Sequence, residues 1–233
     1  MTSAWLSFWD APNAIYVNAR HKDVHYRLIA EQIATLVPSP QARVLDYGCG
    51  EALHADLVAT KAGELLLCEG APKLRQGLAT RFCGNGKIRV LAPDDVERVA
   101  DHSLDLIVLH SVAQYLTPDE FDARLAMFLR LAKPCATVVV SDVIPPYIPA
   151  ATDAVALLRF GAANGFLFAA TLGLVRARLS DYWRLRQTLG LTRYSEATMM
   201  QKLAAAGFVA RRADRNIGHN PARMTFMARP RQA

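Results

Sequence analysis

The fold of this 233-residue chain is decided by the stretch Arg43-Val44-Leu45-Asp46-Tyr47-Gly48-Cys49-Gly50-Glu51. The stretch reads as a short buried strand, an acidic residue, two glycines around a small residue, and then the start of a helix near Ala52. Glycines at 48 and 50 let the backbone turn sharply and let a ligand approach with no Cβ in the way. A helix starting here would direct its unsatisfied N–H groups at that ligand. The stretch therefore predicts a nucleotide-type site.

Two kinds of ligand compete for this turn. A dinucleotide site needs G-x-G-x-x-G/A, so that a pyrophosphate can lie on the helix N-terminus, but the third small position here is Leu53. Asp46 and Glu51 flank the glycines, and two carboxylates would repel a pyrophosphate. They favour a ligand that carries an amino group and a sulfonium, which describes S-adenosylmethionine.

The run V-L-D-x-G-C-G at residues 44–50 resembles the first motif of the class I S-adenosylmethionine-dependent methyltransferases. The resemblance covers about residues 44–143. Residues 130–134 resemble the L-K-P-G-G turn of that family, except that Cys135-Ala136 replace the glycine pair. The resemblance implies S-adenosylmethionine as the cofactor and S-adenosylhomocysteine as the product.

Strand and helix patterns alternate along the chain. Apolar runs predict strands at 43–47, 65–68, 88–91, 104–109 and 137–140, with two closing strands at 207–209 and 224–227. Helical spacing predicts helices at 17–37, from 52, and at 73–82, 94–99, 118–132 and 196–206, with Thr117 and Ser195 as N-caps. We therefore expect an α/β, doubly wound, mostly parallel, seven-stranded Rossmann-like sheet with a C-terminal antiparallel strand and a helical lid insertion.

We expect a single domain with four parts. These are an N-terminal helical cap (1–40), a cofactor-binding core (41–145), the helical lid insertion (146–193), and a closing helix with a strand hairpin (194–233).

The resemblance also implies roles for residues after the later strands. Glu69, which follows the second apolar run, would accept hydrogen bonds from both ribose hydroxyls. Asp94 or Asp95 would accept from the adenine amino group, with Val96 against the ring. Tyr16 and Tyr115, ahead of Trp9 and Phe8, are candidates to face the sulfonium, because aromatic faces attract cations. The predicted cofactor-binding residues are Tyr16, Asp46, Gly48, Cys49, Gly50, Glu69, Gly70, Asp94, Asp95, Val96, His110, Ser111 and Tyr115.

Methyl transfer is an in-line displacement in which the protein mainly positions two reactants. A hydroxyl acceptor needs a general base, and the predicted catalytic residues are His110 and Asp142, at the ends of the fourth and fifth strands. His21, His25 and His219 are weaker candidates. An amine acceptor would lose its proton to water and need no dedicated base.

Composition limits the partners. The net charge of +6 is mild, and the arginines of the C-terminal half carry no aromatic-interleaved stripe, so nucleic acid is not expected as a partner. Four scattered cysteines form no C-x-x-C pair, so we expect no metal site and a reducing compartment. The N-terminus lacks a signal-peptide pattern, which favours a cytoplasmic protein.

The segment 150–191 is apolar and bears arginines. Three roles stay open for it: the pocket of a small, apolar or lipid-like acceptor, peripheral contact with the inner membrane face, and a homodimer contact. Its markers are Phe160, Phe166, Leu167, Phe168, Leu172, Leu174 and Val175, followed by Arg176, Arg178, Arg184 and Arg186.

The sequence is also compatible with two other functions. One is an NAD-type oxidoreductase, which Leu53 and Asp46 disfavour. The other is a non-catalytic S-adenosylmethionine-binding module.

Overall fold

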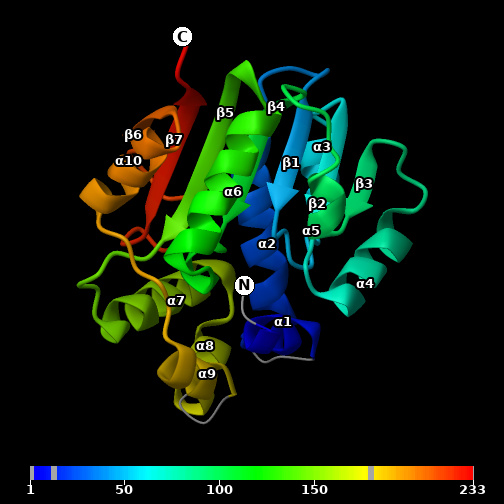
Figure 1. The fold of residues 1–233 in the computed structure, drawn as a ribbon. Helices are drawn as coiled ribbons and strands as arrows, with labels where there is room; N and C mark the ends of the chain where they lie inside the picture. The colour runs from blue at the N-terminus through cyan, green and yellow to red at the C-terminus, as the bar shows by residue number, and fades with distance from the viewer. Residues whose placement is uncertain (1–2, 12–14, 178–180, 233) are drawn as a thin grey trace.

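Seven strands form one sheet in the order β3-β2-β1-β4-β5-β7-β6, seen in a computed structural model that describes residues 3–11, 15–177 and 181–232 (Figure 1). The first five strands are parallel, whereas β7 runs antiparallel to both β5 and β6. The predicted sheet is confirmed. The strands are β1 (Arg43–Tyr47), β2 (Glu64–Cys68), β3 (Ile88–Leu91), β4 (Leu104–His110), β5 (Ala132–Val143), β6 (Phe208–Arg212) and β7 (Met224–Pro230).

Helices cover both faces of this sheet (Figure 1). They are α1 (Ser3–Asp10), α2 (Ala19–Ala34), α3 (Ala55–Ala59), α4 (Pro72–Phe82), α5 (Pro93–Val96), α6 (Pro118–Leu131), α7 (Ala150–Asn164), α8 (Leu167–Ala177), α9 (Asp181–Leu189) and α10 (Glu196–Ala205), with a 3₁₀ turn η1 at Ala113–Tyr115.

Alternate strand residues feed two separate cores, because successive side chains of a strand point to opposite faces. Val44 and Leu106 pack with α2, α3 and α4 on one face. Leu45 and Ile107 pack with α6 and α10 on the other, where Phe128 is fully buried. Burial on both faces explains why the parallel strands are continuous apolar runs.

Two predicted helix caps are confirmed. The Thr117 hydroxyl accepts from Glu120 N at 3.2 Å while the Glu120 carboxylate accepts from Thr117 N at 2.9 Å, which completes a capping box at α6. Ser195 Oγ accepts from Thr198 N at 3.0 Å at the start of α10.

Several predicted boundaries are wrong, and two of them have a clear physical reason. The helix after β1 begins at Ala55 rather than near Ala52, because Ala52 has a φ of 41° and cannot continue a right-handed helix. β5 starts at Ala132, not Thr137, since the chain passes directly from α6 into the sheet. The missing N–H of Pro134 is tolerated because the register is irregular between Leu104 and Leu106 on the neighbouring strand.

The insertion between β5 and α10 is helical. Helices α7, α8 and α9 lie below the carboxyl ends of the parallel strands in the view of Figure 1, and α7 packs against α2. Gly165, with a φ of 75°, ends α7 and lets the chain turn back into α8. Arg178 lies outside the described residues. The four-part division of the domain stays a prediction.

Replacing Phe128 with Ala should lower the free energy of unfolding by about 3–5 kcal/mol, because it opens a cavity in the core shared with Tyr47. Urea denaturation followed by circular dichroism measures this. Val209→Ala, at a side chain that is 61% exposed, is the control and should change stability by less than about 0.5 kcal/mol. Equal effects for the two variants would contradict the described core.

Candidate active site

A cavity of about 540 Å³ lies at the carboxyl ends of β1, β2, β4 and β5. This is the edge at which open parallel sheets bind ligands, and the volume suits a small-molecule site. Its walls come from α1 and α2, from the strand ends, and from the loop between β6 and β7.

At the turn of residues 48–50, close neighbours leave no room for a side chain on either glycine. A Cβ on Gly48 would lie 2.5 Å from Val112 Cγ2, and one on Gly50 would lie 2.8 Å from Tyr26 Oη. Both glycines also have positive φ angles, 79° and 60°. The backbone therefore approaches the cavity as closely as the sequence predicted.

The helix N-terminus, however, is not at this turn. Gly50 N donates to Glu69 Oε2 at 2.9 Å, and Glu51 N donates to Tyr26 Oη at 3.0 Å. These N–H groups are satisfied within the protein, and α3 begins only at Ala55. The prediction that a helix would direct unsatisfied N–H groups from this turn at a ligand is wrong.

Glu69 is the central acceptor at the end of β2. Its side chain is 7% exposed, and Ala71 N donates to Oε1 at 2.8 Å. Burial raises the pKa of Glu69, while the backbone donors of Ala71 and Gly50 oppose that rise. Each carboxylate oxygen accepts one backbone bond and keeps a lone pair for a ligand hydroxyl.

Asp46 lies at the end of β1, next to this carboxylate. Burial, with a smaller contribution from the charge of Glu69, raises the pKa of Asp46 to about 7. A cation bound here would favour the ionised form of Asp46. This acidic end of the cavity therefore fits a ligand with a cationic group and a ribose diol.

Most of the predicted site residues line the cavity. They are Tyr16, Asp46, Gly48, Cys49, Gly50, Glu69, Gly70, Asp94, His110, Ser111, Tyr115 and Asp142. Asp95 and Val96 are not among the lining residues. The Asp95 carboxylate accepts from Ala92 N at 3.2 Å as a cap of α5, and Val96 is fully buried in the core. Of the two aspartates, Asp94 is the one at the cavity.

Aromatic side chains cover the acidic end from the N-terminal side. Tyr115 packs against Trp5 and Trp9 of α1, with ring centroids 4.7 and 5.6 Å apart. Trp9 lines the cavity as well. Helix α1 thereby becomes a wall of the site.

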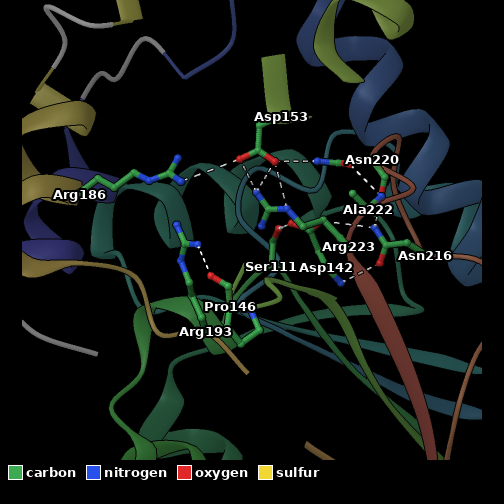
Figure 2. A network of polar contacts seen from close by, with 10 residues as sticks. All are labelled: Ser111, Asp142, Pro146, Asp153, Arg186, Arg193, Asn216, Asn220, Ala222 and Arg223. Carbon is green, nitrogen blue, oxygen red and sulfur yellow. Dashed lines mark hydrogen bonds and ion pairs between the residues drawn. The ribbon is translucent and has the colours of Figure 1, made fainter. Parts of the chain in front are cut away.

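The ends of β4 and β5 are strained. Ser111 and Asp142 have φ angles of 57° and 58°, which cost non-glycine residues about 1–3 kcal/mol each. The Ser111 hydroxyl donates to the Asp142 carboxylate, and Asp142 N donates to Asn216 Oδ1 at 3.1 Å (Figure 2). Such strain is typical of functional sites.

His110 lies beside these two residues. Its Nδ1 contacts Ser141 Oγ at 2.9 Å, and burial lowers its pKa although the charge of Asp142 opposes the shift. A neutral imidazole at this position can accept a proton.

Sequence reasoning missed two polar residues of the β6–β7 loop. Asn216, which holds Asp142, and Arg223, at the cavity wall, come from this loop. His219 lines the cavity too, as do His21 and His25 of α2, although all three ranked as weaker candidates. The glycine at position 218 is a local sequence feature that could have indicated an unusual backbone turn in this loop, and its φ is 104°.

Comparisons with known proteins agree with this geometry. Residues 45–144 match the family model described as a methyltransferase domain. Curated protein sequences gave no match. Among solved structures, an S-adenosylhomocysteine complex of DhpI aligns over 98% of this chain and 96% of its own, with 13% identity and a TM-score of 0.62.

Two further structures share the fold. The YcgJ protein from Bacillus subtilis aligns over 90% of this chain and 100% of its own, with 12% identity and a TM-score of 0.59. The CurJ carbon methyltransferase aligns over 92% of this chain and 56% of its own, with 14% identity and a TM-score of 0.57. The match at residues 45–144 identifies this part of the chain as a methyltransferase domain, and the structures that align with it share its fold.

Proposed function

We propose that this methyltransferase transfers the methyl group of S-adenosylmethionine to an oxygen or nitrogen of a small, apolar or lipid-like acceptor. The observation that carries the proposal is a single cavity with two unlike ends. Asp46 and Glu69 lie at the carboxyl ends of β1 and β2, whereas His110 and Asp142 lie at those of β4 and β5, on the other side along the strand order.

The acidic end would hold the cofactor. Glu69 would accept from the ribose hydroxyls, Asp46 would face the cationic amino acid part, and Asp94, which lines the cavity, would accept from the adenine amino group. Gly48, Cys49, Gly50 and Gly70 allow the close approach, and Tyr16 and Tyr115 cover the ligand. The sulfonium supplies both the methyl group and a neutral thioether leaving group.

The other end would hold the acceptor. His110 takes the proton of an acceptor hydroxyl while the oxygen forms its bond to the methyl carbon, and the sulfur keeps the electron pair of the broken bond. Asp142 and Ser111 fix this edge of the site and stabilise the imidazolium that forms. For an amine acceptor, the same edge would only position the nitrogen.

Carbon methylation and a non-catalytic binding role are the competing functions. A carbon acceptor would need the same base to remove a proton from carbon. A binding module would need no base, and the strained Ser111–Asp142 pair next to His110 disfavours it.

The outer face of α8 supports peripheral contact with an anionic membrane surface, in preference to a homodimer. Phe168 is 83% and Val175 68% exposed, and with Leu172 they lie on one helical face. Residues 154–177 contain no acidic residue, and Arg159 and Arg176 are exposed. None of the helices in the described ranges is long and apolar enough to cross a membrane. The contact would be with the inner membrane face of a cytoplasmic enzyme.

Glu69→Gln should weaken binding of S-adenosylmethionine at least tenfold, because it removes the charged acceptor at the ribose position. Isothermal titration calorimetry measures the affinity. Glu64→Gln is the matched control: Glu64 begins the same strand and pairs with Arg43 at 2.7 Å, away from the cavity. An unchanged affinity in Glu69→Gln would remove this residue from the site.

Vesicle flotation tests the membrane contact. We expect the protein to float with vesicles containing phosphatidylglycerol but not with pure phosphatidylcholine, and Phe168→Ser with Val175→Ser should abolish flotation. Thr171→Ser, on the same exposed face, is the control. Failure of the wild-type protein to float, together with a dimer in light scattering, would favour the homodimer instead.

A further inference from the structure

Five histidines line the cavity: His54 pairs with Asp23 at 2.8 Å, and the other four come from three separate segments. His21 and His25 come from α2, His110 from the end of β4, and His219 from the loop before β7. The ring centroids of His25 and His219 are 5.6 Å apart. The ring centroid of His21 lies 6.0 Å from that of His25 and 6.3 Å from that of His219. The proposed function uses only His110, so the other three imidazoles need an explanation.

The pKa of each of these four imidazoles is lowered, which favours the uncharged form at neutral pH. Burial is the main cause that lowers each pKa, and it brings that of His21 to about 4. The neighbouring imidazoles lower the pKa of His21 and His25 further. The charge of Asp142 raises the pKa of His110 and of His219 and so opposes the effect of burial. At His219 the charge of Asp153 also raises the pKa, whereas that of Arg223 lowers it. Within the described chain, no group of His, Cys, Asp or Glu has the arrangement of a metal site.

Aromatic rings of the lid hold two of these imidazoles. Phe166 stacks on His21 with ring centroids 4.9 Å apart and planes at 21°, and Phe160 stacks on His219 at 4.6 Å and 17°. The ring centroids of Tyr16 and His25 are 5.5 Å apart. We name this group of His21, His25, His219 and Tyr16, backed by the two phenylalanines, the imidazole chamber. Such flat, largely apolar walls favour a ligand with a flat, apolar body.

The charged groups beside the chamber are already paired. Arg223 Nη2 donates to both carboxylate oxygens of Asp153, at 3.0 and 2.9 Å, and Asp153 also accepts from Asn220 at 2.8 Å (Figure 2). The Asp142 carboxylate accepts from the Ser111 hydroxyl, and Asn216 Nδ2 lies 3.4 Å from its other oxygen. A carboxylate ligand would compete with Asp153 for Arg223, and an ammonium ligand would compete with Ser111 and Asn216 for Asp142.

We infer that the imidazole chamber binds the methyl acceptor, and that this acceptor is an uncharged molecule with a hydroxyl group on a flat, apolar body, of which a phenol is the simplest case. The inference rests on the proposed function and names its substrate class. A neutral imidazole has one acceptor nitrogen and one N–H donor, so it can bond a hydroxyl in either direction. It offers no countercharge, so a charged group held by the imidazoles alone would lose its hydration without compensation.

Three probes of similar size test the charge selection. They are 4-methylphenol, 4-hydroxyphenylacetate and tyramine, titrated at pH 7.5 into protein saturated with S-adenosylhomocysteine and carrying ¹³C-labelled imidazoles. We expect 4-methylphenol to shift the resonances of His25 and His219, and to bind at least tenfold more tightly than either charged probe. Equal or tighter binding of a charged probe would overturn the inference.

Variants test the imidazoles themselves. His25→Phe and, separately, His219→Phe keep a flat ring but remove the nitrogens, and each should weaken 4-methylphenol binding about fivefold to tenfold. His102→Asn is the control, since His102 is absent from the cavity lining and its φ of 49° suits asparagine. Unchanged 4-methylphenol affinity in both chamber variants would refute the chamber as the acceptor site.

Calorimetry with S-adenosylhomocysteine tests the proposed function separately from the inference about the acceptor site. If the wild-type protein fails to bind S-adenosylhomocysteine, the proposed function fails and the inference with it. If S-adenosylhomocysteine binds equally to wild type and to both chamber variants while the phenol results go against expectation, only the inference fails.

Discussion

Two carboxylates, Asp46 and Glu69, lie together at the carboxyl ends of the neighbouring strands β1 and β2. Moving them out of water is costly, and the pKa of Asp46 is raised to about 7 as a result. Backbone N–H groups of Gly50 and Ala71 offset part of that cost at Glu69. A bound cation would offset the rest, so the proposed cofactor site would be pre-organised for a cationic ligand at the expense of the empty protein's stability.

The proposed acceptor end depends on contacts between distant segments. Asp153 of the lid holds Arg223 and Asn220, Asn220 O accepts from Asn216, and Asn216 holds Asp142 (Figure 2). This chain of polar contacts joins α7 to the end of β5 through the β6–β7 loop. The imidazole chamber lies along the same path, so the lid and the loop position the acceptor walls together.

Local patterns predicted what depends on local physics. The apolar run at residues 43–47 predicted β1, and the caps Thr117 and Ser195 predicted the starts of α6 and α10. These features could be predicted because strand burial and helix capping depend on residues that are close in the sequence. The start of α3 was mispredicted, since the positive φ of Ala52 has no signal in its side chain. Asn216 was missed because it meets Asp142 across 74 positions, and no local pattern marks such a partner.

The pH dependence of S-adenosylmethionine affinity tests the acidic end most directly. Because the pKa of Asp46 in the empty site is about 7, affinity measured by calorimetry should rise between pH 5.5 and 7.5 as Asp46 ionises and attracts the cation. Binding at pH 6 should release protons, seen as a heat that varies with the ionisation enthalpy of the buffer. Asp46→Asn should bind more weakly and lose this pH dependence. An affinity that is flat with pH in the wild type, or a pH profile unchanged in Asp46→Asn, would contradict the account.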